Sequence, residues 1–197
     1  MLRSNFRKSP NLKRVFDLTV LPFLFLFLMI PFVLISVLIK MTSNGPVFYW
    51  SDRIGRYNQI FSMPKFRTMH VETPSLATHL IDNPEAYLTP VGSFLRKSSL
   101  DELPQLWSIL KGDMSFVGPR PALFNQYDLI ALRNQYGIDK EVPGLTGWAQ
   151  VNGRDELSIP EKVKFDKEYL MKRSFLFDIK ILWLTVKKVM RSDNVLH

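Results

Sequence analysis

The sequence contains no cysteine and only 3 histidines, which removes several kinds of site at once. Without cysteine the chain can form neither a disulfide framework nor a thiolate metal site, and an intracellular address is permitted. The histidines, His70, His79 and His197, do not stand at a spacing typical of metal ligands. We therefore expect any metal bound by this chain to have oxygen ligands.

Acidic residues are also scarce relative to basic ones. The chain has 18 Asp and Glu against 26 Lys and Arg, which gives a formal net charge of +8. This balance favours a partner that is nucleic acid, anionic lipid or a phosphate-rich substrate, and it does not choose among them. At 197 residues the chain is long enough for one domain with its own core and one appendage.

The appendage is an apolar run, residues 18–39, without a single charged side chain. As one helix it would be roughly 33 Å long, about the thickness of a bilayer core. The run is longer than the apolar region of a usual signal peptide, and no cleavage site of small residues follows it. The sequence therefore predicts a segment that stays in a membrane.

Two topologies remain open for this segment. Basic residues lie on both sides of it, so the positive-inside rule places both flanks on the cytoplasmic side. Pro31 stands just past the middle and removes a helical hydrogen bond. A re-entrant helix that breaks at Pro31 and returns to the same face satisfies both observations. A plain transmembrane helix is the alternative, since such helices also contain prolines.

The remaining residues predict a small α/β domain. Residues 45–69 are typical of a β-hairpin that turns at residues 56–59, and residues 70–87 predict a loop with one short helix. Ser99 and Glu102 have the spacing of a capping box, which predicts a helix that ends at Gly112. Its apolar stripe is expected to face inward and consists of Leu103, Leu106, Trp107 and Leu110.

Three further segments complete the expected domain. Residues 143–154 predict a glycine-punctuated loop or a hairpin with a turn at Asn152 and Gly153. Ser158 and Glu161 form a second capping box, which predicts a helix as far as about residue 172. Residues 175–190 mix large apolar side chains with lysines, which is typical either of a helix in a membrane interface or of a core helix whose lysines reach out to water.

Two adjacent carboxylates, Asp101 and Glu102, are the candidate chemical groups. Acidic residues are common in the first turn of a helix, where the free N–H groups stabilise negative charge, so the pair alone needs no further explanation. Its neighbours change that reading, because Arg96 precedes it and Arg120 follows between two prolines that stiffen the backbone. A rigid arginine can grip phosphate oxygens, and a carboxylate among cations can bind Mg²⁺ or attack phosphorus. The pattern favours phosphoryl transfer beside a membrane.

Four segments in collinear order make the interpretation more specific: KFRTM at 65–69, SLDELPQLWSILKGDMSFVGPRP at 99–121, PGLTGWAQVNGR at 143–154 and SFLFDIKILWLTVKKV at 174–189. Together they resemble the bacterial sugar transferase family, in particular its small monotopic phosphoglycosyl transferases. The resemblance implies a mostly α-helical α/β monotopic membrane protein. Residues 1–41 would form the basic N-terminus and the re-entrant helix, and residues 42–197 a cytosolic or interfacial catalytic domain with a β-hairpin and amphipathic interfacial helices.

The resemblance also implies a reaction and its partners. Such an enzyme transfers a phospho-sugar from a UDP-sugar to polyprenyl (undecaprenyl) phosphate, and it releases UMP in the first membrane step of bacterial glycoconjugate assembly. It would lie in the cytoplasmic (inner) membrane among membrane lipids, with its catalytic domain on the cytoplasmic face. Downstream glycosyltransferases would use its product, and nucleic acid is not expected as a partner.

Roles for individual residues follow from the same resemblance. Asp101 would be the nucleophile that forms a covalent phospho-sugar intermediate, and Asp101 and Glu102 would bind Mg²⁺. The remaining site residues would hold substrate or phosphate or lie close to the site: Arg96, Arg120, Arg154, Lys65, Arg67, Asp166 and Tyr169. The same phosphate-binding loops would serve hexose and acetamido-sugar donors, so the resemblance does not choose the sugar.

The sequence departs from the family pattern in three places. Ile30 stands where a small polar residue often precedes the membrane proline, Tyr57-Asn58-Gln59 replaces a glycine turn, and DKEVPG lacks a basic residue directly before PG.

Two other functions compete with the transferase. One competing function is a membrane-anchored UDP-sugar hydrolase. The other is a non-enzymatic module that binds anionic lipid, for which Asp101 would be dispensable.

Overall fold

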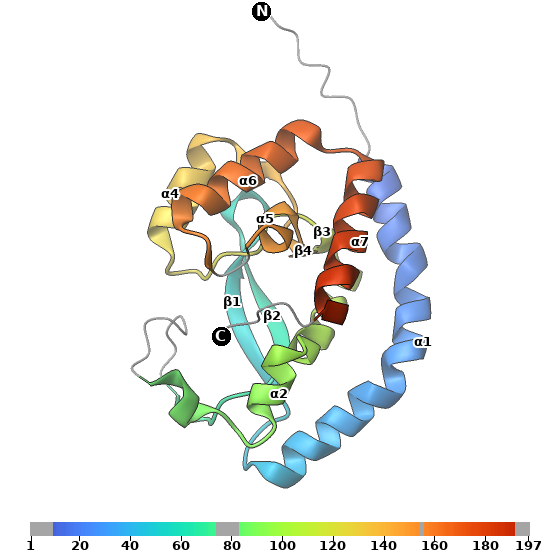
Figure 1. Cartoon of the computed structure of the whole chain (residues 1–197), viewed down its shortest axis with the longest axis vertical. Coiled ribbons are helices and arrows are strands. Elements are labelled where there is room, and N and C mark those ends of the chain that lie inside the picture. Colours follow the sequence, from blue (N-terminus) through green and yellow to red (C-terminus); the bar gives the residue numbers. More distant parts are fainter. Residues whose placement is uncertain (1–9, 74–82, 154–155, 192–197) are drawn as a thin grey trace, which may run out of the picture.

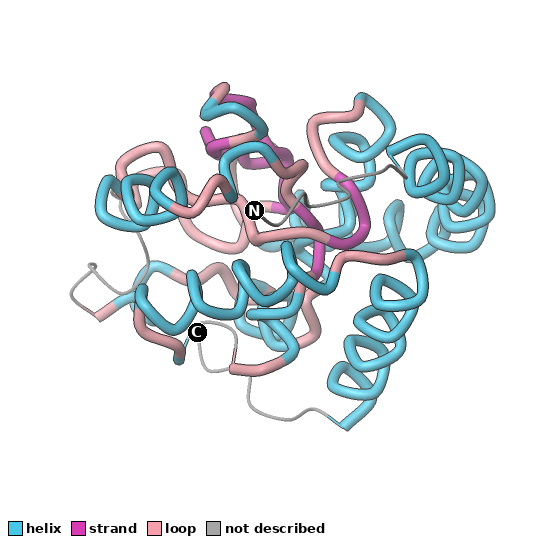
Figure 2. Tube along the Cα trace, turned by 90° about the horizontal axis from the view of Figure 1, so that it is seen from above, coloured by secondary structure: helices cyan, strands magenta, loops and turns pink. Residues whose placement is uncertain are grey.

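The structure is a computed structural model that describes residues 10–73, 83–153 and 156–191. Helices make up most of this part of the chain, and the strands are confined to a few short segments (Figure 2). Seen in Figure 1, one long helix forms an edge of the molecule and the other elements gather on one side of it. This arrangement agrees with the predicted mostly helical α/β class.

The long helix is α1, Pro10–Thr42, and it contains Pro22 and Pro31. Figure 1 shows that α1 bends about half-way along its length. The helix is nevertheless continuous through Pro31, so the predicted break is not an interruption of helical structure. A proline removes one hydrogen bond and bends a helix without having to end it. The predicted return to the same membrane face stays a prediction.

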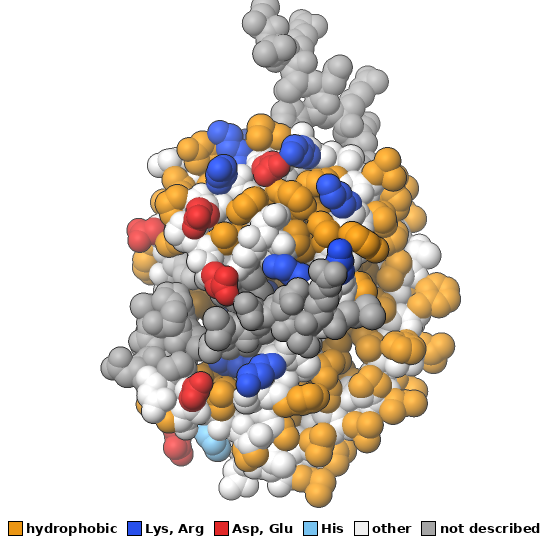
Figure 3. Space-filling model, viewed as in Figure 1, with side chains coloured by type: hydrophobic (Ala, Val, Ile, Leu, Met, Phe, Trp, Pro, Cys, Tyr) orange, Lys and Arg blue, Asp and Glu red, His pale blue; other side chains and the backbone are white. Residues whose placement is uncertain are grey.

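Among the described residues, one helix is long and apolar enough to cross a membrane. It covers Leu12–Thr42, and its most apolar stretch has a mean hydropathy of 2.8. One side of it carries exposed apolar residues: Phe23, Leu26, Phe27, Met29, Ile30, Val33 and Leu34. Figure 3 shows hydrophobic side chains along this edge, whereas the charged side chains in the same view lie away from it.

The other side of α1 packs against the domain along the whole helix. Leu21 joins a buried cluster with Ile109 of the helix that follows the acidic pair. Further along, Ile39 joins a second buried cluster with Phe66 and Leu95. The helix therefore has one side for the protein and one that is exposed and apolar.

The predicted hairpin is confirmed. Strands β1, Phe48–Ile54, and β2, Ile60–Phe66, pair antiparallel, and a short 3-10 helix, η1, Arg56–Asn58, joins them. Tyr57 and Asn58 both have left-handed backbone, with φ of 56° and 58°. The turn thus keeps the geometry that glycine usually provides, at a cost in strain for Tyr57. In the register Tyr49 stands opposite Lys65, and Ser51 stands opposite Met63.

The segment around the acidic pair differs from the predicted single helix. After η3, Pro84–Tyr87, and α2, Gly92–Lys97, a 3-10 helix, η4, covers Leu100–Gln105 and α3 covers Leu106–Lys111. Ser99 has a left-handed backbone with φ of 57°, which is not the extended geometry of a capping residue. Gly112 ends α3 with φ of 95°, as predicted.

The change from 3-10 to α geometry also shifts which side of α3 is buried. Leu106 is buried as predicted, but Trp107 and Leu110 are 51% and 41% exposed. Ser108 and Ile109 are buried in their place. Each residue of a 3-10 helix turns the chain through about 120°, against about 100° in an α-helix, so an apolar stripe extrapolated from Leu103 with α-helical spacing does not stay in phase.

Residues 143–154 were predicted to form a loop or a hairpin, and the structure instead places part of them in a second, parallel pair of strands. Strand β3, Ser115–Val117, pairs with β4, Gly144–Thr146. The short helix α5, Trp148–Val151, follows, and Asn152 is its C-terminal cap rather than a hairpin turn residue. Between the strands lie α4, Tyr127–Gln135, and the 3-10 helix η5, Ile138–Lys140.

The last two helices were predicted well. Helix α6, Ile159–Lys172, begins at the expected capping box of Ser158 and Glu161. Helix α7, Phe175–Arg191, buries Ile181 and exposes Trp183 at 61%. It therefore combines a face in the core with an outer face of apolar residues and lysines, which is the amphipathic pattern that both interpretations of this helix share.

Candidate active site

The acidic pair lies in η4, which packs against strand β2. Asp101 and Glu102 are only 7% and 8% exposed, although both are ionisable. The left-handed backbone of Ser99 starts this tight turn, and Pro104 lies within it. A short, proline-containing turn fixes both carboxylates in place, so they form a rigid feature rather than the mobile start of a helix.

Two cations from different elements meet Glu102. Lys65 Nζ, on β2, is 3.0 Å from Glu102 Oε1, and Arg120 Nη2 is 2.8 Å from the same oxygen. Lys65 Nζ is 3.6 Å from Asp101 Oδ2, which is close enough for charge attraction but too long for a hydrogen bond. Glu102 is thus the carboxylate that organises the cations, and Asp101 is held less tightly beside it.

The electrostatics of Asp101 reflect this difference. Burial raises the pKa of the Asp101 carboxyl, and the neighbouring Glu102 charge raises it further, whereas Lys65, Arg120 and Arg96 lower it. Arg96, in α2, donates from Nε to Thr68 Oγ1 at 3.0 Å. The structure therefore brings together five of the predicted residues, Asp101, Glu102, Lys65, Arg96 and Arg120.

Arg67 is not part of this group, although it follows Lys65 by two positions. Strand β2 ends at Phe66, so the alternation of faces does not extend to Arg67. Its guanidinium is buried and donates to the backbone carbonyls of Ser43 and Asn44, just after the end of α1. Arg67 therefore fastens the end of the long helix, and its part in lining the phosphate-binding face stays a prediction.

Asp166 and Tyr169 were also expected close to the site, which stays a prediction, and the structure gives both of them buried partners. Asp166 is 1% exposed and accepts hydrogen bonds from Arg133, whose Nη1 also donates to the backbone carbonyl of Arg120. Tyr169 donates to Asp178 Oδ1 at 2.8 Å and accepts from Lys13 Nζ at 2.7 Å. Arg154, the remaining predicted residue, lies outside the described residues.

Two of the partners just named, Arg133 and Asp178, were not singled out from the sequence. Each is an ordinary charged residue on a helix, and its importance comes from a buried partner on another helix. The signal that could have found them is the same in both cases, because Asp166 and Tyr169 stand on the inner side of α6 and a buried polar group needs a partner.

The acidic pair fits Mg²⁺ on the chemistry of its donors. Among the described ranges, no group of three or more His, Asp or Glu side chains is placed to hold a metal ion. Mg²⁺ does not need such a cage, because it is commonly bound by one or two carboxylates together with substrate phosphates and water. Asp101 and Glu102 offer two adjacent carboxylates near three cations that suit phosphate, Lys65, Arg96 and Arg120.

Similarity to known proteins extends over nearly the whole chain. The sugar transferase EpsL of Bacillus subtilis (strain 168) is 41% identical over 184 residues, which cover 93% of this chain and 90% of that protein. The undecaprenyl-phosphate glucose phosphotransferase of Komagataeibacter xylinus is 37% identical over 92% of this chain, and the undecaprenyl-phosphate galactose phosphotransferase of Salmonella typhimurium (strain LT2) is 36% identical over 95% of it. This chain spans 36% and 42% of the length of those two proteins.

The match to a family is equally extensive. Residues 8–192 match the family described as bacterial sugar transferase. The matched range includes the long helix, the acidic pair with its cations, and the helices α6 and α7. Because the similarity covers the membrane segment and the site together, it does not depend on any single motif. The chain belongs to the bacterial sugar transferase family.

Proposed function

We propose that this protein transfers a phospho-sugar from a UDP-sugar to polyprenyl phosphate, giving polyprenyl-diphosphate-sugar and UMP. The observation that carries the proposal is the buried acidic pair of Asp101 and Glu102, set among Lys65, Arg96 and Arg120. The relatives named as undecaprenyl-phosphate glucose and galactose phosphotransferases support the same reaction class. The product would pass to the glycosyltransferases that extend lipid-linked glycans.

The reaction is proposed to proceed in two displacements on one phosphorus atom. A carboxylate oxygen of Asp101 forms a bond to the sugar-linked phosphorus while the bond from that phosphorus to the bridging oxygen breaks, and UMP leaves with the electron pair. A phosphate oxygen of polyprenyl phosphate then attacks the same phosphorus, and the aspartyl oxygen leaves as a carboxylate. Covalent storage lets a soluble donor and a lipid acceptor use one site in turn.

The remaining residues of the site supply charge and position. Glu102 holds Lys65 and Arg120 beside the nucleophile, where their cations suit the oxygens of a diphosphate. Mg²⁺ bound by Asp101 and Glu102 would neutralise the diphosphate so that an anionic carboxylate can approach phosphorus. Burial of Asp101 removes water that would otherwise shield the nucleophile.

The membrane helix is proposed to be re-entrant, with the catalytic domain at the cytoplasmic face of the inner membrane. Support comes from the two ends of α1, which are both fastened to the same domain. At its start Arg14 donates to the carbonyls of Ile109 and Leu110, and at its end Arg67 donates to those of Ser43 and Asn44. A helix that crossed the bilayer would have to separate these two attachments by the whole membrane.

The absence of cysteine makes this topology easy to test. Single cysteines introduced as Ser4→Cys and Asn44→Cys flank the helix in an otherwise thiol-free chain. Intact spheroplasts and inverted vesicles would then be treated with a membrane-impermeant maleimide. A re-entrant helix leaves both cysteines reactive in inverted vesicles and protected in spheroplasts. Reaction of one cysteine from each side would show a plain transmembrane helix.

The enzymatic activity is tested by UMP release with detergent-solubilised protein, Mg²⁺ and polyprenyl phosphate. The donors are UDP-glucose, UDP-galactose and their N-acetylamino counterparts, since phosphate-binding loops do not choose among these sugars. UMP formation that matches the formation of lipid-diphosphate-sugar supports the transferase. Steady UMP release that does not need the lipid identifies the hydrolase instead, and no release with any donor leaves the lipid-binding module.

A further inference from the structure

The loop that contains Arg120 has few backbone N–H groups that could hold its conformation. Pro119 and Pro121 flank the arginine, and proline has no backbone N–H to donate. Two of three successive residues therefore cannot be anchored through their amides. The conformation of the loop therefore depends on the hydrogen bonds that its carbonyl oxygens accept from other parts of the fold.

Each of the three carbonyls in this loop accepts a hydrogen bond from a different part of the fold. The Gly144 amide donates to Pro119 O at 2.9 Å. Arg133 Nη1 donates to Arg120 O at 2.8 Å, and Arg53 Nη1 donates to Pro121 O at 3.3 Å. The shortest of these bonds involves Arg120 itself, which makes Arg133 the donor closest to the residue that matters for the site.

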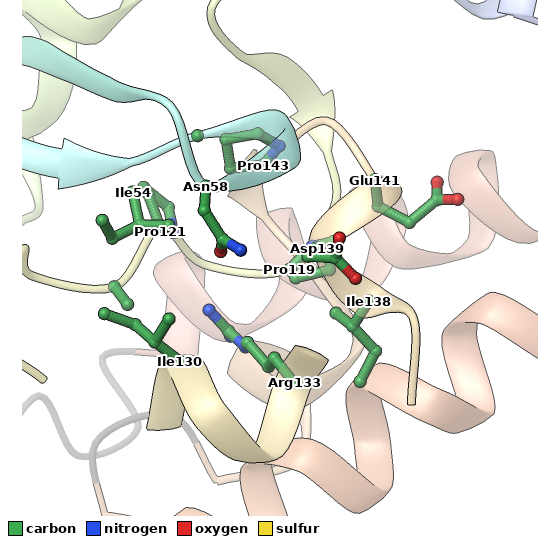
Figure 4. A pocket seen from close by; sticks show the side chains of 12 residues that line it. Ile54, Asn58, Pro119, Pro121, Ile130, Arg133, Ile138, Asp139, Glu141 and Pro143 are labelled. Atoms are coloured by element: carbon green, nitrogen blue, oxygen red, sulfur yellow. The ribbon is translucent and has the colours of Figure 1, made fainter. Parts of the chain in front are cut away.

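Arg133 is itself held from behind by a buried carboxylate. Its Nε and Nη2 lie 3.0 Å and 2.6 Å from Asp166 Oδ2, and the two side chains are 12% and 2% exposed. Figure 4 shows Arg133 rising from α4 into a pocket whose lining includes Pro119 and Pro121. One guanidinium thus connects α6, through Asp166, to the backbone of the Arg120 loop.

We propose that Arg133 and Asp166 are positioning residues that place Arg120 for the reaction, a role that rests on the proposed transferase function. Arg120 Nη2 must reach Glu102 Oε1, 2.8 Å away, from a backbone that Arg133 fixes on the other side. A displacement of about 1 Å at a site of phosphoryl transfer can cost ~100-fold in rate. A buried ion pair gives little net stability, which points to positioning as the reason for this one.

The test uses a substitution that removes both charges together. The double variant Arg133→Gln with Asp166→Asn leaves no unpaired buried charge, so we expect it to fold. We expect kcat for UMP release to fall about tenfold. The matched control, Arg173→Gln with Glu141→Gln, removes another arginine–carboxylate pair near α6 and should keep kcat within about twofold.

A double-variant cycle decides whether the pair acts through Arg120. In an Arg120→Ala background the Arg133→Gln, Asp166→Asn substitutions should have no further effect on the residual kcat, because the side chain that they position is gone. The same tenfold loss in both backgrounds would overturn the proposal, since it would show a general structural effect. The single variant Arg133→Lys should have an intermediate kcat. Lysine keeps the charge but cannot reach both Asp166 Oδ2 and the backbone carbonyl of Arg120.

Hydrogen exchange tests the positioning without reference to activity. The amides of Arg120 and Ala122 should exchange about tenfold faster in the Arg133→Gln, Asp166→Asn variant, while those of strands β1 and β2 should not change. Unchanged exchange in the loop would overturn the inference. If loop exchange rises but the wild type releases no UMP with any donor, the proposed function fails and the support of the loop stands.

Discussion

Two of the buried clusters of charged side chains in the described part of the chain are built on opposite principles. In the first, Lys13, Tyr169 and Asp178 join α1, α6 and α7, and both oxygens of Asp178 face a donor, Tyr169 at 2.8 Å and Lys13 at 3.3 Å. In the second, Asp101 stands 3.6 Å from Lys65, while Glu102 takes the short contacts. The first cluster satisfies its carboxylate and the second leaves a carboxylate available.

The pKa directions express the same contrast. Burial raises the pKa of the Tyr169 hydroxyl, and the Asp178 carboxylate adds to the effect, so that hydroxyl stays protonated and acts as a donor. Burial also raises the pKa of Asp101, but there it disfavours the carboxylate form that the proposed attack on phosphorus needs. We infer that the first cluster stabilises the fold and that the second gives up stability for the proposed reactivity.

The largest expected effect is that of Asp101→Asn. UMP release should fall by at least ~10³-fold, because the nucleophile is removed. At the same time Tm at pH 7 should rise by about 2–4 °C, the shift that ~1 kcal/mol gives in a chain of this size. A carboxyl whose pKa is raised by folding costs stability when it is ionised, and the amide removes that cost.

Asp52→Asn is the matched control for this prediction, because Asp52 is exposed on β1. It should change neither UMP release nor Tm. An Asp101→Asn protein that keeps activity, or one that loses it only because it unfolds, would contradict the account of the second cluster.

Glu102→Gln should act in the opposite direction on stability. It leaves Lys65 and Arg120 without their shared carboxylate, and removal of one partner from a largely buried ion pair costs about 3 kcal/mol. We expect a lower Tm together with a loss of about 100-fold in UMP release, measured on the same preparations. An increase in Tm, like that predicted for Asp101→Asn, would show that the two carboxylates do not differ as described.

The pH dependence of activity should reveal the raised pKa of Asp101. As pH falls through that pKa the carboxylate is protonated, so the acid limb of kcat/KM should lie above the ordinary aspartate value of about 3.9. Increasing Mg²⁺ should move the limb to lower pH, because a bound cation favours the carboxylate, and EDTA should abolish activity. A limb that does not respond to Mg²⁺ would argue against metal ligation by the pair.

The smallest expected effect on catalysis belongs to the first cluster. Tyr169→Phe removes the hydroxyl that bonds Asp178 and should lower the free energy of unfolding by about 1–2 kcal/mol. UMP release per folded molecule should stay within about twofold of the wild type. A loss of activity without a loss of stability would place Tyr169 in the reaction after all.

The sequence predicted the local features well. The hairpin of β1 and β2 and the start of α6 are determined by turn residues and by a capping box within a few positions. It failed where the answer depends on contacts between distant segments. The strands β3 and β4 have only three residues each and pair in parallel, so no alternation of apolar and polar residues along the chain indicates them.

The site shows the same division. Asp101, Glu102 and Arg120 could be found because they lie within one stretch with a strong local pattern. The contacts of Arg67 and Tyr169 could not be predicted, because they depend on where a strand ends and on which helix packs against α6. Arg133 was missed because its partner Asp166 lies 33 residues away.

The central claim is that Asp101 carries the phospho-sugar between donor and acceptor. The most direct measurement is UMP release with UDP-sugar and Mg²⁺ in the absence of polyprenyl phosphate, followed by the intact mass of the protein. The account predicts about one UMP per molecule and a matching phospho-sugar adduct, both absent in Asp101→Asn. Continuous release of UMP without an adduct would contradict it.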